Sequence, residues 1–180
     1  MNSLLETKDV DDAFELLLVI TGIICAIMSQ YPEYFWRYFA QYPEGYPMAL
    51  AATRSLILPL ILALVLWISG KLVTNPRYQA IIKVFAWMYA LSLTFGNALM
   101  YLLGSGWLPL DSSAGALLGN IVFFLIVPSF NYFVVLPKYK TIYPQSRFLQ
   151  SKIMFIAASF VALLLFLFTA GFFTPASLPT

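Results

Sequence analysis

Residues 151–173 read SKIMFIAASFVALLLFLFTAGFF, with Lys152 as the only charged residue. A helix of this length is long enough to cross the hydrocarbon core of a bilayer, which is about 30 Å thick. Four more apolar segments of similar character precede it, at about residues 14–31, 48–73, 78–103 and 113–136. The sequence therefore predicts an all-α, polytopic integral membrane protein with five transmembrane helices.

Composition supports this fold class. Hydrophobic side chains make up 61% of the 180 residues and charged side chains 10%, with a mean hydropathy of +0.83. Soluble domains average about 45–50% apolar and about 25% charged residues. Five helices of about 20 residues leave no room for a separate soluble domain. We predict one membrane domain at residues 14–173, between an acidic tail at 1–13 and an outer tail at 174–180.

The first segment is the shortest, and whether it crosses the bilayer fully is open. Its uninterrupted apolar part, residues 16–28, also has the length of a signal-peptide core. Signal peptides begin with basic residues, whereas residues 1–15 hold five acidic residues and one lysine. No A-x-A cleavage pattern follows. We therefore predict a short transmembrane helix here.

The basic residues predict the orientation. Lys and Arg favour the cytoplasmic side of a membrane. The first tail and the second and fourth loops hold eight of the ten basic residues, namely Lys8, Lys71, Arg77, Lys83, Lys138, Lys140, Arg147 and Lys152. Arg37 and Arg54 belong to the other side. We predict a cytoplasmic N-terminus and an outer or lumenal C-terminus, in the cell membrane of a prokaryote or an endomembrane of a eukaryote.

Several kinds of chemistry are absent from the sequence. The chain has no histidine and a single cysteine, Cys25, so it offers no imidazole metal site, no Ser-His-Asp triad and no disulfide within one chain. The predicted spans hold no pair of carboxylates and no G-x-S-x-G motif. We predict no enzymatic activity, no catalytic residue, no cofactor and no metal. The net charge of +2 gives no reason to expect nucleic acid.

Polar residues within the spans are the first candidates for a site. Arg54, Asn97 and Asn120 each fall about 10 Å from the outer end of a predicted span, with Asp111 in the loop nearby. If they converge, they form a polar cluster in the outer leaflet that suits an anionic headgroup or a small acid. Alternatively, Arg54 extends into the headgroups and the asparagines join helices. Near the cytoplasmic ends, Glu15 and Lys83 are expected to extend toward water.

Two further features suggest surfaces. The outer loop at residues 32–47 is rich in aromatic side chains, including Tyr34, Phe35, Trp36, Tyr38 and Phe39. Such a loop forms either an aromatic belt at the headgroup level or a docking surface for a partner. Gly115 and Gly119 form a small-xxx-small pattern, which is typical of close helix packing within one chain or between two copies.

Three local patterns resemble the Yip/YIPF membrane-protein family over roughly residues 65–173. They are Gly70-Lys71 followed by residues 78–90, the Gly/Pro turn Leu103–Pro109, and Lys140-Thr-Ile-Tyr-Pro144 before the last segment. The resemblance implies five spans, a cytoplasmic N-terminus and a non-enzymatic protein. The Asp-Leu-Tyr-Gly-Pro motif of eukaryotic members is absent, so no residues for small-GTPase binding are carried over.

The functional prediction is a multi-pass protein that acts by contact, as a scaffold or adaptor. Its predicted partners are membrane lipids and other membrane proteins or a second copy of the chain. Two alternatives stay open. One is a small-solute or ion permease that works as an oligomer, with the Arg54, Asn97 and Asn120 level along its path. The other is an accessory subunit of a respiratory or photosynthetic complex.

Overall fold

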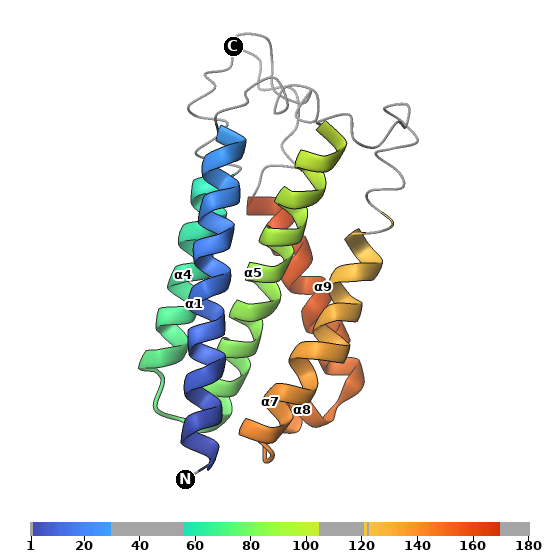
Figure 1. Cartoon of the computed structure of the whole chain (residues 1–180). Coiled ribbons are helices and arrows are strands. Elements are labelled where there is room, and N and C mark those ends of the chain that lie inside the picture. Colours follow the sequence, from blue (N-terminus) through green and yellow to red (C-terminus); the bar gives the residue numbers. More distant parts are fainter. Residues whose placement is uncertain (1, 30–55, 105–120, 122, 170–180) are drawn as a thin grey trace, which may run out of the picture.

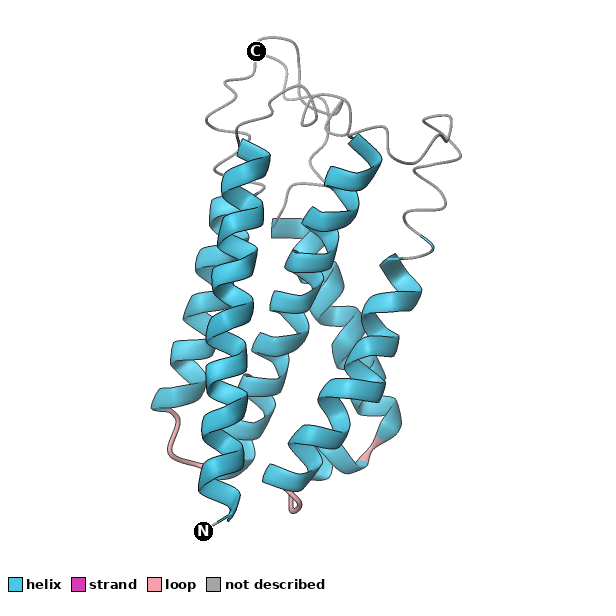
Figure 2. Cartoon of the chain, viewed as in Figure 1, coloured by secondary structure: helices cyan, strands magenta, loops and turns pink. Residues whose placement is uncertain are grey.

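The computed structural model describes residues 2–29, 56–104, 121 and 123–169. These residues form helices and short connections without any strand, as the sequence predicts (Figure 2). The helical elements, in chain order, are α1 (Asn2–Ser29), α4 (Leu58–Leu72), α5 (Pro76–Gly104), the π-helix η2 (Asn131–Val135), α7 (Leu136–Ile142), α8 (Arg147–Gln150) and α9 (Lys152–Thr169).

The helices form an up-and-down bundle (Figure 1). α1 starts at one end, α4 returns to that end, α5 leaves it, η2 and α7 return, and α9 leaves it again. The connections at residues 73–75 and 143–146 therefore lie at the end where α1 begins, as Figure 2 shows. This arrangement gathers the described basic residues around that end of the bundle, which we call the basic end.

α5 is the central helix of the bundle. It packs against α1, α4 and α9. In the most apolar 18-residue window of Pro76–Gly96, 61% of the residues are buried, against 33% in α9. The buried core combines aromatic and aliphatic side chains from all the long helices. It includes Phe14, Trp67, Val84, Met88, Tyr89, Leu93, Phe155, Leu163 and Phe166.

The outward faces of the bundle are apolar. Large apolar side chains are exposed along α1, α4 and α9, among them Leu16, Val19, Ile20, Ile23, Ile57, Leu58, Ile61, Leu64, Val65, Ile68, Ile153, Met154, Ile156, Phe160, Val161, Leu164 and Phe168. Surfaces of this kind are usually covered by a membrane or a partner. Two described segments are long and apolar enough to cross a bilayer, Pro76–Gly96 and Lys152–Thr169, and α4 is a shorter apolar helix.

Two glycines allow close contact between helices. A Cβ at Gly70 of α4 would lie 2.8 Å from the Cγ of Lys83 on α5. A Cβ at Gly96 of α5 would lie 2.6 Å from Cε1 of Phe166, a buried ring on α9. Both positions need the small residue because the neighbouring side chains occupy the space.

The fourth helical stretch, residues 123–142, includes η2 and α7 and therefore contains a π-helical segment near its middle. The amide of Leu136 donates to the carbonyl of Asn131, five residues earlier, so the helix is widened between Pro128 and Pro137. Proline cannot donate a backbone hydrogen bond, which favours such an interruption. The side chain of Asn131 is fully buried, and its Nδ2 donates to Ser159 Oγ of α9 over 2.7 Å.

The helices extend beyond the predicted spans. α1 begins at Asn2, so the described part of the segment 1–13, which we predicted as an acidic tail, is helical. The fourth helical stretch continues past residue 136 to Ile142. Both extensions lie at the basic end (Figure 1), where α1 reaches cations on its neighbours.

Candidate functional site

The basic end of the bundle has the highest density of charged side chains in the described structure. Lys71 lies in the last turn of α4, and Arg77 lies in the first turn of α5, after the connection 73–75. Arg147 and Lys152 follow the connection 143–146. Lys138 and Lys140 lie on α7, and Lys83 lies one turn and a half into α5 from Arg77. These cations divide into a paired set and an unpaired set.

Lys83 belongs to the paired set. Its Nζ donates to both oxygens of Asp11 on α1, at 3.1 and 3.3 Å, and its side chain is only 8% exposed. The prediction that Lys83 extends toward water is therefore wrong. α1 continues past the predicted membrane boundary, covers this part of α5 and provides the carboxylate.

The second ion pair, between Lys71 and Glu15, is more exposed. Both lysines of the two pairs lie near the ring of Trp67. Lys71 Nζ donates to Glu15 Oε1 over 2.8 Å, with the two side chains 42% and 59% exposed. The ring of Trp67 lies 5.4 Å from Lys71 Nζ and 5.2 Å from Lys83 Nζ, and Phe14 stacks on it at 4.0 Å. This paired cluster holds α1 against α4 and α5, so we assign it a structural role.

The members of the unpaired set are exposed, except Lys140, which is half-buried. It consists of Arg77, Lys138, Lys140, Arg147 and Lys152. Within the described part of the chain, the ion pairs are those of Lys71 and Lys83 with Glu15 and Asp11. The five other side chains therefore have no described carboxylate as a partner and leave a local excess of positive charge.

The local sequence explains how α5 presents Arg77. Asn75 Oδ1 accepts a hydrogen bond of 3.1 Å from the Arg77 amide, as at a typical helix N-cap. Pro76 follows at the first helical position, where its missing N–H costs nothing. The helix thus begins at a defined residue, and its first turn carries Arg77 and Tyr78 at the basic end.

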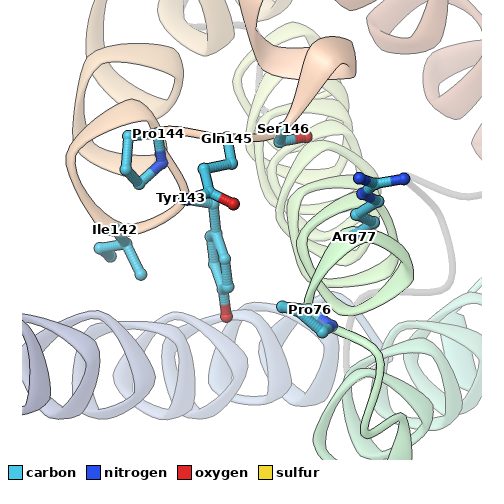
Figure 3. Close-up of a pocket in the computed structure, with 7 residues that line it drawn as sticks. All are labelled: Pro76, Arg77, Ile142, Tyr143, Pro144, Gln145 and Ser146. Atoms are coloured by element: carbon cyan, nitrogen blue, oxygen red, sulfur yellow. The ribbon is translucent and has the colours of Figure 1, made fainter.

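A hollow of about 220 Å³ lies between the start of α5 and the turn after α7. It is lined by Pro76, Arg77, Ile142, Tyr143, Pro144, Gln145 and Ser146 (Figure 3). Figure 3 shows the Tyr143 side chain extending from that turn toward the neighbouring helix below, with Pro76 beside it. The Tyr143 hydroxyl donates to Gln79 Oε1 over 3.4 Å. Burial, and secondarily the negative charge of Asp11, raises the pKa of Tyr143, which stays a neutral hydrogen-bond donor.

A second hollow, of about 410 Å³, adjoins the first one. The two share Arg77, Gln145 and Ser146. The second hollow adds Asn75, Tyr78, Ile81, Arg147, Phe148 and Met154. Its lining therefore combines polar side chains with the exposed apolar side chains of Ile81 on α5 and Met154 on α9.

The turn between α7 and α8 is fixed by its own hydrogen bonds. The Ser146 amide donates to the Tyr143 carbonyl over 3.1 Å, and Gln150 Nε2 donates to the Pro144 carbonyl, also over 3.1 Å. These bonds position Gln145, Ser146 and Arg147 opposite the start of α5. The chemistry offered there is that of guanidinium, amide and hydroxyl groups, which bind anionic oxygen. In the described residues no three His, Cys, Asp or Glu side chains gather as a potential metal site.

Most residues predicted for sites fall where the structure gives no description. Asn97 belongs to α5, whereas the other members of the predicted polar cluster and the two packing glycines lie outside the described residues, namely Arg54, Asp111, Asn120, Gly115 and Gly119. The same holds for the aromatic loop residues Tyr34, Phe35, Trp36, Tyr38 and Phe39. The convergence of this cluster and the role of that loop stay predictions.

Sequence reasoning used the basic loops for orientation but missed the hollows between them. The available signals were Asn75-Pro76, which marks a helix start, and Pro144, which marks a turn. Comparisons of the chain with protein-family models, curated proteins and solved structures give no match.

Proposed function

We propose that this chain is a multi-pass integral membrane protein whose five apolar segments cross the bilayer, with the basic end in the cytoplasm. The observation that carries the proposal is that apolar and charged side chains occupy separate parts of the surface of the described bundle. The outward faces of α1, α4 and α9 expose large aliphatic and aromatic side chains, which acyl chains would cover. The unpaired cations gather at one end, in agreement with a cytoplasmic location for that end.

We propose further that the protein works by contact with lipids or other membrane proteins, as a scaffold or adaptor. Support comes from the groups that the basic end offers, because unpaired guanidinium and ammonium groups and hydrogen-bonding side chains are binding groups. The Yip-like patterns around Gly70-Lys71 and Lys140–Pro144 point to the same kind of protein. No catalytic role is assigned to any residue.

Purification from the native membrane tests this function. The tagged full chain is extracted in a mild detergent, and retained proteins and lipids are identified by mass analysis against a mock purification. The proposal expects a defined set of lipids or membrane proteins retained in near-stoichiometric amounts. A second experiment measures solute and ion flux across liposomes that contain the purified chain. A flux faster than that across protein-free liposomes would contradict a contact function and favour the permease. Migration only within one large respiratory or photosynthetic complex would favour the accessory subunit.

A further inference from the structure

We propose that the two adjoining hollows at the basic end form one binding site for the phosphate-containing headgroup of an anionic phospholipid. The inference rests on the proposed function, because it assigns a ligand class to the basic end of a membrane-spanning bundle. It differs from the predicted outer-leaflet cluster in both residues and side of the membrane.

Charge complementarity is the first argument. Arg77 and Arg147 line the same hollow, and neither forms an ion pair with a described carboxylate. The planar guanidinium group binds phosphate oxygens through two parallel hydrogen bonds. The nearby cations Lys71 and Lys83 are engaged by Glu15 and Asp11. Among the unpaired cations, the two arginines are those that line the hollow.

The position of the polar groups is the second argument. Gln145 and Ser146 line both hollows together with Arg77, so their hydrogen-bonding groups lie where the two hollows adjoin. The larger hollow, of about 410 Å³, falls within the typical size range of ligand pockets, about 300–1,000 Å³. A headgroup phosphate beside the arginines would leave its polar substituent next to the amide and hydroxyl groups.

The apolar residues that line the larger hollow favour a lipid over a soluble phosphate. Ile81 and Met154 are 37% and 54% exposed and line the hollow beside the arginines. Met154 shares a face of α9 with Val161, which is 54% exposed and lies about two turns further along the helix. An acyl chain can follow this surface away from the polar groups, whereas a soluble phosphate would leave it uncovered. Anionic lipids are also enriched in the cytoplasmic leaflet, and basic pockets between helices bind their headgroups.

The test compares two double variants with equal loss of charge. Arg77→Gln with Arg147→Gln removes the two guanidinium groups of the site. Lys140→Gln with Lys152→Gln is the matched control, because these lysines are unpaired at the same end but line neither hollow. Each full chain is reconstituted with phosphatidylcholine and a minority of phosphatidylglycerol. It is then purified in mild detergent, and the retained phosphatidylglycerol per chain is measured by mass analysis.

The expected result is selective loss in the arginine variant. A hydrogen bond to a charged group contributes enough that its loss lowers affinity about tenfold or more. The arginine variant is therefore expected to retain at least about tenfold less phosphatidylglycerol than the parent chain, and the lysine control close to the parent amount. Equal losses in both variants would overturn the site, since they would show attraction by overall charge. Displacement of the lipid by millimolar inorganic phosphate would assign the site to a soluble anion instead.

A measurement on the unmodified chain covers the case in which the arginine variant does not fold. A photoactivatable phosphatidylglycerol analogue is expected to crosslink within residues 75–81 and 143–154, and excess unlabelled phosphatidylglycerol is expected to compete. Crosslinks spread over all helices would contradict the site. Resistance of the chain to alkaline extraction from membranes is measured in parallel. Extraction of the chain by alkali would refute the membrane-spanning proposal. A chain that resists extraction but does not retain the lipid selectively would refute only the binding site.

Discussion

The Asp11–Lys83 pair provides a quantitative prediction. Asp11→Asn removes the negative partner of a lysine whose side chain is 8% exposed, while keeping nearly the same shape. Removing one partner of a buried pair costs about 3–5 kcal/mol. Asp11 itself is 26% exposed, and the lysine stem can turn toward water. We therefore expect a loss of about 2 kcal/mol in the free energy of unfolding.

Glu15→Gln is the matched control because it removes the other carboxylate of the same cluster. Its pair with Lys71 is 42% and 59% exposed, and exposed pairs contribute about 0.2–1 kcal/mol. Unfolding is followed by circular dichroism during heating in detergent micelles. For a chain of this size, 1 kcal/mol shifts the Tm by about 2–4 °C. Asp11→Asn is thus expected to lower the Tm by about 4–8 °C, and Glu15→Gln by less than about 4 °C.

A third variant distinguishes the loss of the Asp11–Lys83 ion pair from the effect of substituting residue 11 itself. Lys83→Met in the Asp11→Asn background removes the uncompensated charge and keeps an apolar side chain in the buried site, so it is expected to recover much of the lost stability. The reasoning is refuted if Asp11→Asn and Glu15→Gln lower the free energy of unfolding equally. It is also refuted if Lys83→Met adds a further loss instead of a recovery.

The remaining predictions concern helix packing and a buried hydrogen bond. Gly96→Ala is expected to cost about 1–3 kcal/mol, because the new methyl group overlaps the Phe166 ring. Gly22→Ala, where nothing lies within 4 Å, is expected to be neutral or stabilising in the same thermal assay; equal effects would contradict the described α5–α9 contact. Ser159→Ala leaves Asn131 Nδ2 without its hydrogen-bond acceptor and is expected to cost about 1–3 kcal/mol. An unchanged Tm for this variant would argue against the hydrogen bond.

The long helices could be predicted from sequence because their signal is local. The apolar runs before and after Pro76 and after Ser151 are long and bounded by basic or turn-forming residues. α5 and α9 lie along the second and third of these runs, and α4 lies along the described end of the first. The all-helical fold was predicted for the same reason. Two described segments meet the length and hydropathy requirements of a span, so the count of five crossings remains part of the proposal.

Contacts between distant residues could not be predicted in this way. Lys83 and Asp11 are 72 residues apart in sequence, and only the packing of α1 on α5 joins them. For the same reason, the sequence alone gives no sign that the acidic segment contacts α5 through Asp11. Gly96 faces the ring of Phe166, which lies 70 residues later in the sequence. The sequence shows there only a small residue within an apolar helix, which does not reveal the contact. The hollows likewise depend on two connections whose proximity follows from the bundle.

Cysteine accessibility tests the central claim most directly, namely that the bundle spans a membrane with its basic end in the cytoplasm. In a Cys25→Ser background, Gln145→Cys marks the basic end and Gly45→Cys marks the predicted outer loop. A membrane-impermeant maleimide applied to intact cells, or to sealed vesicles of the same orientation, is expected to label position 45 only. Position 145 is expected to react after permeabilisation. Labelling of position 145 in sealed membranes, or of both positions from the same side, would contradict the account.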